Sequence, residues 1–112
     1  LYGWGRNDKG QLGSGSVDAF KEPKVLLSNF DGVPIRSISC GSECTMILDH
    51  NNVVRGTGWN EHGNLGVGST KDIISPTELA GARITAPPPW DGKGEIIMAA
   101  GGAHFLVMKV FR

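Results

Sequence analysis

Residues 5–16 read GRNDKGQLGSGS and residues 58–69 read GWNEHGNLGVGS, so one motif occurs twice at an offset of 53 positions. Both copies keep one asparagine, four glycines, one leucine and the final serine. The same offset still holds further along, at Pro23 and Pro76. Repeats of this length are typical of propellers, solenoids and other repeat arrays.

A second shared segment follows each copy of the motif. It reads ISCGSE at residues 38–43 and MAAGGA at residues 98–103, an offset of 60 positions, so the second copy is about seven residues longer between its landmarks. The main irregularity is the stretch APPPWDG at residues 86–92. Because proline-rich segments are stiff and Trp90 is a large anchor, we interpret this stretch either as a partner-docking segment or as an insertion loop whose Trp90 packs on its own blade.

The secondary-structure signal is β throughout the chain. Short apolar or alternating runs bounded by turn residues predict strands, and DHNN at residues 49–52 predicts a hairpin turn. No stretch keeps a helical period beyond about two turns. Besides the Trp/Gly stretches, the predicted strands lie at residues 25–27, 35–40, 45–48, 53–55, 95–100 and 104–108.

These signals predict the blades of a propeller. Four short antiparallel strands in a unit of about 50 residues describe one blade. We therefore expect an all-β protein with two four-stranded antiparallel blades, at residues 1–52 and 53–112, the second carrying the insertion near residues 86–92. The chain has no initiator methionine and begins inside an apolar strand pattern, LYGW at residues 1–4, so we expect a fragment of a larger propeller.

The repeated glycines and leucines have structural roles in such a blade. The Gly-x-Leu-Gly turns need positive φ angles, at which a Cβ would clash. In the second shared segment, Gly41 and Gly101 are expected to approach the neighbouring blade. Leu12 and Leu65 are expected to fill the inner edge of their own blade. Pro23 and Pro76 are each expected to start a strand. The structural positions of the repeat are Gly10, Leu12, Gly13, Gly41, Gly63, Leu65, Gly66 and Gly101.

The composition favours a folded domain and excludes some classes of partner. The 112 residues are 39% hydrophobic and 20% charged, and 11 acidic and 11 basic residues leave no net charge. A buried core agrees with these values, whereas direct binding of nucleic acid or of an anionic membrane has no electrostatic basis. No apolar run reaches the roughly 18 residues that a membrane helix needs.

Cysteine and histidine spacing predicts no metal and no cofactor. Cys40 and Cys44 form a lone Cys-x-x-x-Cys pair, which we interpret as buried thiols of a reducing compartment, with a disulfide as the alternative. The histidines lack ligand spacing, and we interpret His104 as a hydrogen-bonded blade residue. The glycine-rich residues 10–15 are not followed by the Lys-Ser/Thr pair of a phosphate-binding loop.

The two copies resemble the repeat of the regulator of chromosome condensation family. The residues that carry the resemblance are YGWGRNDKGQLG at residues 2–13, a proline about ten positions later, and SCGSE at residues 39–43. The sequence departs from the pattern where Cys44 replaces the family's usual histidine and where Thr57 stands at the position of Trp4 in the first copy. The resemblance implies that about seven such blades close into a ring, so that the remaining blades are partners of these two.

A narrower resemblance rests on GWNEHGNLG at residues 58–66. This stretch looks like the last blade of the subgroup that holds the fungal alpha-tubulin suppressor and the animal secretion-regulating exchange-factor-like protein. For the fungal branch, the resemblance implies a cytoplasmic and nuclear adaptor. Its implied partner is a small zinc-ribbon electron carrier that serves diphthamide synthesis and Elongator-dependent tRNA wobble modification.

Three classes of function follow. The sequence favours a non-catalytic scaffold or adaptor that binds a protein partner, because it contains no catalytic constellation; neighbouring turn residues such as Glu61 and His62 point apart and do not make an acid–base pair. The alternatives are a guanine-nucleotide exchange factor for a small GTPase, the activity of the founding family member, and a chromatin-associated module, against which the zero net charge argues. The candidate partner-binding residues are Trp59, Glu61 and His62, from the subgroup resemblance, and Trp90, from the proline-rich stretch.

Overall fold

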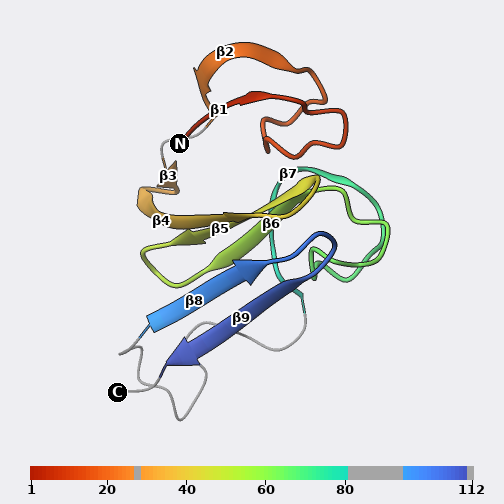
Figure 1. Ribbon diagram of the computed structural model, residues 1–112. Helices are drawn as coiled ribbons and strands as arrows, with labels where there is room; N and C mark the ends of the chain where they lie inside the picture. The colour runs from red at the N-terminus through yellow and green to blue at the C-terminus, as the bar shows by residue number, and fades with distance from the viewer. Residues whose placement is uncertain (27–28, 81–94, 111–112) are drawn as a thin grey trace.

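Figure 1 shows a computed structural model of the chain, which describes residues 1–26, 29–80 and 95–110. Within these residues the chain forms nine β-strands and no helix. The strands are β1 (Tyr2–Gly5), β2 (Phe20–Val25), β3 (Asn29–Phe30), β4 (Val33–Cys40), β5 (Cys44–Asp49), β6 (Val54–Gly58), β7 (Ile73–Glu78), β8 (Glu95–Ala100) and β9 (Phe105–Val110).

The strands form three antiparallel sheets that lie one above another (Figure 1). β1 pairs with β2, and β8 pairs with β9. Between these two pairs lies the largest sheet, in the order β3-β4-β5-β6-β7, where β3 is a short addition to the edge of β4. The all-β class and the antiparallel strands expected from the sequence are therefore confirmed.

The sheets do not follow the period of the sequence. The expected boundary between residues 52 and 53 falls inside the middle sheet, because β5 and β6 pair along their length, from Cys44↔Gly58 to Leu48↔Val54. The middle sheet therefore takes β4 and β5 from the first copy and β6 and β7 from the second. The division at residues 1–52 and 53–112 is not the division of the sheets, because consecutive strands joined by a tight turn pair with each other whatever the period of the sequence.

The repeat relates the two outer sheets to the two halves of the middle sheet. β1 and β2 correspond to β6 and β7 at the offset of 53 positions, and β8 and β9 correspond to β4 and β5 at the offset of 60 positions. Even an irregularity is shared, because the ladder register shifts between Gly3 and Gly5 and again between Gly56 and Gly58. Each outer sheet is thus equivalent to one half of the four-strand unit formed by β4 to β7.

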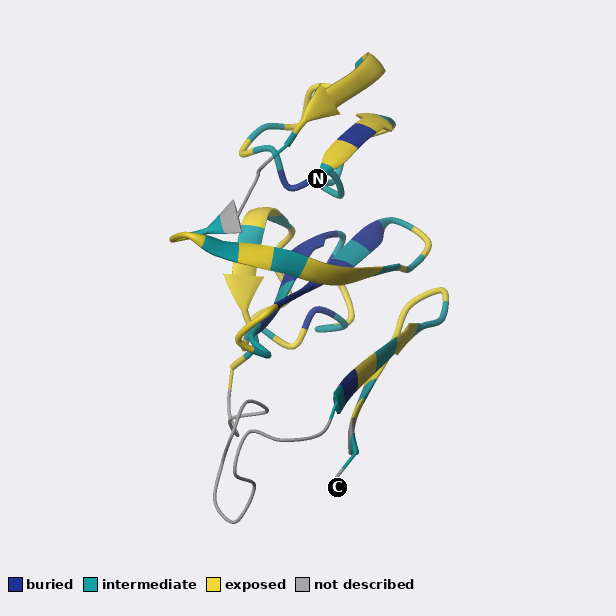
Figure 2. Ribbon diagram, turned by 90° about the vertical axis from the view of Figure 1, so that its left-hand side faces the viewer, coloured by how far each residue is buried: buried dark blue, intermediate teal, exposed yellow. Residues whose placement is uncertain are grey.

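The main core lies between the middle sheet and the β8–β9 hairpin. Its buried centre consists of Met46 and Leu48 on β5, Val54 on β6 and Ile96 on β8. Because side chains alternate along a strand, Ile47 points to the opposite face, and it is buried as well. β5 is therefore covered on both faces, as the dark blue strands at the centre of Figure 2 show. Partly buried side chains complete this core: Leu79, Met98, Phe105 and Val107.

A buried aspartate builds the turn that joins the two copies. Asp49 Oδ1 accepts hydrogen bonds from the backbone N–H groups of Asn51 at 2.8 Å and Val53 at 3.0 Å, and Oδ2 accepts one from Arg55 Nη1 at 2.7 Å. Burial opposes the ionisation of this carboxyl, but the Arg55 and backbone donors outweigh it and hold the pKa of Asp49 below its ordinary value. The hairpin turn expected at residues 49–52 is confirmed, and its tightness brings β5 and β6 into one sheet.

The glycine turns have the backbone conformation that the sequence predicts. The φ angles are 81° at Gly10, 69° at Gly13, 68° at Gly63 and 69° at Gly66. At Gly10 an added Cβ would also lie 2.7 Å from the Cα atom of Ile74. Side chains at these positions would therefore cost backbone strain in both copies, and a steric clash at Gly10 as well.

The expected roles of the two leucines, Leu12 and Leu65, and of the two glycines, Gly41 and Gly101, are met in part. Leu65 is fully buried and packs against Gly56, whereas Leu12 is only half-buried. A Cβ at Gly41 would lie 3.1 Å from the carbonyl oxygen of Gly101, so this glycine allows the close approach between sheets that was expected. At Gly101, however, the added Cβ would meet the imidazole of His104 in its own turn.

The two prolines lie within strands rather than at their starts. Pro23 is the fourth residue of β2 and Pro76 is the fourth residue of β7. Among the described residues, β2 pairs only with β1, and β7 pairs only with β6. An edge strand tolerates proline because one side of its backbone makes no ladder hydrogen bonds, so the expected position was wrong but the reason for tolerance still applies.

Candidate functional site

The candidate site is the loop that follows β6, and a buried asparagine fixes its shape. Asn60 Oδ1 accepts a hydrogen bond from the backbone N–H of Leu65 at 3.0 Å, and Nδ2 donates to the carbonyl oxygens of Ser69 and Lys71, each at 2.9 Å. Asn7 makes the equivalent three contacts in the first copy. Sequence reasoning gave this asparagine no role, although its recurrence at the offset of 53 positions was the available signal.

The loop brings three of the four predicted partner-binding residues together. The rings of Trp59 and His62 meet edge to face, with centroids 5.1 Å apart. Trp59 Nε1 lies 3.4 Å from Glu61 Oε2. Glu61 and His62 are exposed and Trp59 is half-buried. The expectation that Glu61 and His62 point apart overlooked Trp59, which both side chains contact.

The corresponding loop of the first copy presents charges in place of aromatic rings. Arg6 Nε donates to Asp8 Oδ1 at 2.7 Å, and Arg6 Nη1 lies 2.8 Å from Glu43 Oε1. The hydrogen bond from Arg6 lowers the pKa of the Asp8 carboxyl, and the bond to Asp8 together with the charge of Glu43 raises the pKa of the Arg6 guanidinium. The positions of Arg6 and Asp8 are those of Trp59 and Glu61 in the second copy.

Glu43 connects the two loops into one surface. Its side chain makes the ion pair with Arg6, and its carbonyl oxygen accepts a hydrogen bond from the backbone N–H of Trp59 at 2.9 Å. A partner that contacts Trp59 therefore finds the charged first loop beside it. The first loop is fixed to the middle sheet as well, because Thr45 Oγ1 donates to the carbonyl oxygen of Gln11 at 2.8 Å.

A depression of about 450 Å³ lies next to the second loop. His62 and Asn64 line it from the loop, and His104 and Phe105 line it from the β8–β9 hairpin. Asn64 Nδ2 donates to the carbonyl oxygen of Trp59 at 2.8 Å, whereas Asn64 Oδ1 is buried without a hydrogen-bond partner among the described residues. The loop thus borders a hollow with polar groups at its rim.

Cys40, Cys44 and His104 differ in their exposure. Both cysteines are free thiols: Cys44 is buried as expected, but Cys40 is exposed. Burial raises the pKa of the Cys44 thiol, which makes it a poor nucleophile. His104 is exposed, and its carbonyl oxygen accepts a hydrogen bond from Gly101 at 2.9 Å. In the described part of the chain, no group of three or more His, Cys, Asp or Glu side chains is arranged to hold a metal ion.

Trp90, and with it the proline-rich stretch at residues 86–92, lies outside the described residues. No helix in residues 1–26, 29–80 or 95–110 is long and apolar enough to cross a membrane.

Sequence comparison relates the chain to a repeat family. The model of the regulator of chromosome condensation (RCC1) repeat matches residues 1–48. The protein RCC2 homolog of Xenopus laevis is 39% identical over 80 residues, which are 70% of this chain and 15% of that protein. The ultraviolet-B receptor UVR8 of Arabidopsis thaliana is 36% identical over 79 residues, 70% of this chain and 18% of the receptor. The chain thus spans less than a fifth of the length of these relatives.

Structural comparison supports the same relationship. Yeast RCC1 (Prp20), in its complex with Kap60, superposes with a TM-score of 0.74 at 25% identity, covering 97% of this chain and 26% of the yeast chain. Prp20p from Saccharomyces cerevisiae, reported with its binding properties to Gsp1p and histones, gives the same values. Human WBSCR16 shares the fold, with a TM-score of 0.72 at 23% identity over 97% of this chain and 26% of its own. These likenesses confirm the antiparallel propeller architecture expected from the sequence.

Proposed function

Because this chain is an RCC1-type repeat protein, we propose that it serves as a non-catalytic propeller scaffold whose second loop binds a protein partner. The observation that carries the proposal is the Trp59–Glu61–His62 cluster on a loop held by buried Asn60. Tryptophan supplies a large contact area with few rotatable bonds, and such anchors dominate the energy of protein interfaces. A loop whose backbone is already ordered loses little entropy when it binds.

The chemistry of the cluster defines the partner that it fits. The half-buried Trp59 offers its indole ring and Glu61 its carboxyl group, and the imidazole of His62 lines the depression. A complementary partner has an apolar pocket for Trp59 and a basic group for Glu61. The ion pair between Arg6 and Glu43 lies beside Trp59 and places charged groups at the edge of this binding surface.

The finer proposal names the partner and the compartment. From the resemblance of residues 58–66, the partner is a small zinc-ribbon electron carrier, and the assembled propeller acts as an adaptor in diphthamide synthesis and Elongator-dependent tRNA modification in the cytoplasm and nucleus. This proposal needs no cofactor and no metal on the propeller itself. Trp90 remains a second candidate anchor.

Binding to a small GTPase with nucleotide exchange is the second candidate function. The similarity to Prp20p, which is reported with its binding properties to Gsp1p, favours it. An exchange factor acts by deforming its partner, so it would use the same kind of loop surface without an acid or a base of its own. The histone binding reported for Prp20p makes a chromatin module the third candidate, against which the zero net charge of this chain argues.

The test is a titration of the protein with the zinc-ribbon carrier and, in parallel, with a panel of nucleotide-loaded small GTPases. Trp59→Ala is expected to weaken binding to the true partner roughly thirtyfold or more, since a buried Trp anchor contributes about 2 kcal/mol or more. The matched control is Arg6→Ala, which changes the equivalent position of the first loop and is expected to have a much smaller effect.

The outcomes separate the candidates. Zinc-ribbon binding without nucleotide release supports the adaptor. Nucleotide release from one GTPase without zinc-ribbon binding supports the exchange factor and overturns the adaptor. Equal losses from Trp59→Ala and Arg6→Ala would show that Trp59 is not the dominant anchor of the binding surface.

A further inference from the structure

In the first loop, an exposed carboxylate has a guanidinium bound to it. Arg6 donates from Nε to Asp8 Oδ1 at 2.7 Å and from Nη2 to Asp8 Oδ2 at 3.0 Å. A third contact, of 2.8 Å between Arg6 Nη1 and Glu43 Oε1, connects the same guanidinium to the turn between β4 and β5. Because a planar guanidinium matches a carboxylate in this two-bond arrangement, both oxygens of Asp8 have a charged donor.

The second loop has the carboxylate without the guanidinium. Glu61 stands at the position of Asp8, and Trp59 stands at the position of Arg6. Trp59 Nε1 lies 3.4 Å from Glu61 Oε2, which is longer than the roughly 2.7–2.9 Å of a charge-assisted hydrogen bond. Within residues 1–26, 29–80 and 95–110, no basic side chain forms an ion pair with Glu61. The carboxylate of Glu61 can therefore accept the two charged hydrogen bonds that Asp8 already receives.

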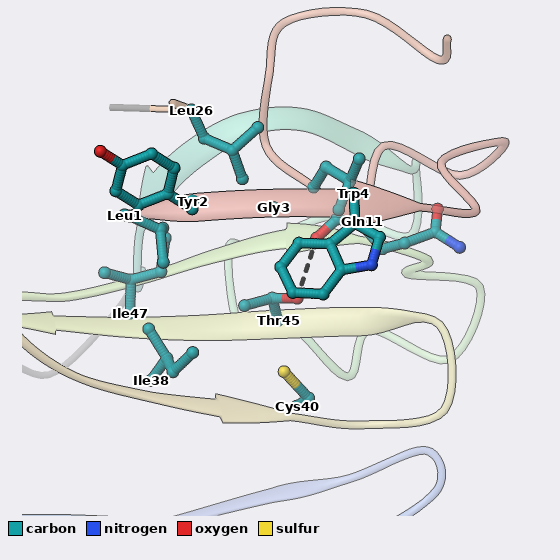
Figure 3. Close-up of a pocket in the computed structure, with 11 residues that line it drawn as sticks. Leu1, Tyr2, Gly3, Trp4, Gln11, Leu26, Ile38, Cys40, Thr45 and Ile47 are labelled. Atoms are coloured by element: carbon teal, nitrogen blue, oxygen red, sulfur yellow. Dashed lines mark hydrogen bonds between the residues drawn. The ribbon is translucent and has the colours of Figure 1, made fainter. Parts of the chain in front are cut away.

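The first loop is covered on the sides that face the rest of the molecule. Figure 3 shows the hydrogen bond from Thr45 Oγ1 on β5 to the carbonyl oxygen of Gln11, which measures 2.8 Å. Gly10 and Gly13 are buried against β7. This loop therefore shows which of its residues stay accessible once neighbouring strands pack against it.

The residues that stay accessible are those at the tip of the loop. The side chains of Arg6 and Asp8 are 64% and 52% exposed although the rest of their loop is covered. Glu61 is exposed at the same place on the second loop. Its exposure is thus a property of the loop tip and does not depend on what covers the residues below it.

We infer that the protein partner supplies the missing cation as an arginine side chain, which binds Glu61 as Arg6 binds Asp8 within the first loop. The inference rests on the proposed binding role of the second loop and specifies the basic group as a guanidinium. A guanidinium seated on Glu61 Oε2 also reaches the indole, because Trp59 Nε1 is 3.4 Å from that oxygen. Arginine stacks on aromatic rings and binds carboxylates through two parallel hydrogen bonds, whereas the lysine ammonium is a point charge.

The second loop holds both recognition groups in place before the partner arrives. The backbone N–H of Trp59 donates to the carbonyl oxygen of Glu43 at 2.9 Å, and the ring of His62 packs edge to face on the indole at 5.1 Å. An ordered site loses little entropy on binding. Because Ala103 stands where the first copy has Glu43, the partner's guanidinium binds one carboxylate, and Trp59 replaces the second carboxylate as its other contact.

The first test titrates the 112-residue protein with N-acetyl-arginine amide and, separately, with N-acetyl-lysine amide, and follows the tryptophan indole N–H signals by NMR. The signal of Trp59 is identified by its loss in Trp59→Phe. Since a single exposed ion pair is weak, we expect the arginine probe to shift this signal with half-saturation on the order of 10 mM. The lysine probe is expected to bind at least about threefold more weakly.

The variants of this titration assign the contact to Glu61. Glu61→Gln is expected to weaken the response of the Trp59 signal to the arginine probe about tenfold. The matched control is Asp8→Asn, which removes the equivalent carboxylate of the first loop and is expected to leave that response unchanged. No shift of the Trp59 signal with the arginine probe, or the same titration in Glu61→Gln as in the native protein, overturns the inference.

The second test gives the first loop the residue that distinguishes the second. Arg6→Trp removes the internal guanidinium from Asp8 and places an indole beside that carboxylate, with circular dichroism to verify folding. We expect the additional indole signal to shift with the arginine probe, and the double variant Arg6→Trp, Asp8→Asn to weaken this shift at least about fivefold. An additional indole signal that does not respond to the probe contradicts the equivalence of the two loops on which the inference depends.

Titration with the protein partners separates this inference from the proposed function. With a partner whose binding requires Trp59, Glu61→Gln is expected to weaken binding about tenfold. A loss from Trp59→Ala without a loss from Glu61→Gln leaves the binding role in place and overturns the arginine contact. Binding of the arginine probe without binding of the zinc-ribbon carrier or of any GTPase supports the arginine-recognising surface and overturns the named partners.

Discussion

The two glycine loops have the same backbone and different surfaces. In each, a buried asparagine holds the loop by the same three hydrogen bonds, and two glycines have φ angles within a narrow range of one another. At the two surface positions the first loop carries Arg6 and Asp8 and the second carries Trp59 and Glu61. The comparison teaches that buried polar contacts and glycine conformation fix the shape, which leaves the surface positions free to acquire a binding role.

The two copies also differ in what surrounds them. The first loop packs on the middle sheet, whereas the second has no such strand over it among the described residues. Equivalent residues therefore have different neighbours, and substitutions at matched positions separate the effect of conformation from the effect of packing.

The largest difference is expected between Gly58→Ala and Gly5→Ala. Both glycines have positive φ, 109° and 95°, but a Cβ at Gly58 would lie 2.6 Å from the carbonyl oxygen of Glu43, while at Gly5 nothing lies within 4 Å. Backbone strain alone costs about 1–2 kcal/mol, and we expect about 4 kcal/mol at Gly58 because a backbone atom has to move. Urea unfolding at one fixed protein concentration measures both. Equal losses would show that strain, and not the approach of β5, sets the cost.

Asn60→Ala is expected to destabilise the protein by about 3 kcal/mol, because it leaves one buried N–H and two carbonyl oxygens without their partner. Asn7→Ala is expected to cost a similar amount, since the contacts match. The measurement is urea unfolding together with the intrinsic tryptophan fluorescence, to which Trp59 contributes. A loss below about 1 kcal/mol in both variants would mean that the loop backbone is held by other contacts.

Asp49→Asn tests the turn that joins the copies through its dependence on pH. The folded pKa of Asp49 lies below the ordinary value of 3.8, so its ionised form stabilises the fold fully above that value and the stabilisation is lost as pH falls through the folded pKa. The variant is therefore expected to be less stable at neutral pH, by about 2 kcal/mol, and to approach the native protein in acid. Asp18→Asn, at an exposed position, is the control. A difference that does not change between pH 7 and acid contradicts a role for the charge.

Asp8→Asn is expected to have the smallest effect. The Arg6–Asp8 pair is exposed on both sides, and such pairs are screened by water and salt. We expect no measurable change in the melting temperature, and a matching result for Glu61→Gln in the second loop. A clear loss from either variant would mean that surface contacts, and not the buried asparagines, hold the loops.

Much of the architecture could be predicted from the sequence. The recurrence of the glycine motif predicts repeated turns, and the positive φ angles of Gly10, Gly13, Gly63 and Gly66 confirm it. The predicted turn at residues 49–52 is also present. These features are local, because a positive φ angle or a tight turn depends on a few adjacent residues. Trp59, Glu61 and His62 were selected from the resemblance of residues 58–66, and their contacts with one another were not predicted from the sequence.

Other features required the arrangement of the whole chain. The repeat could not show at which residue one sheet ends and the next begins, because a period of 53 residues is the same wherever a blade is taken to begin. The burial of Asn7 and Asn60, the exposure of Cys40 and the difference between Leu106 and Met46 each depend on which sheet lies opposite.

The sequence by itself determined the repeat, the all-β class and the conformation of the glycine turns, because each is set by the spacing and the steric properties of neighbouring residues. Only the tertiary structure decided that β5 and β6 share one sheet, and that equivalent positions in the two copies are buried in one place and exposed in the other. Burial and pairing are relations between segments far apart in the chain, and two equivalent segments acquire different environments when only one of them has a neighbouring sheet.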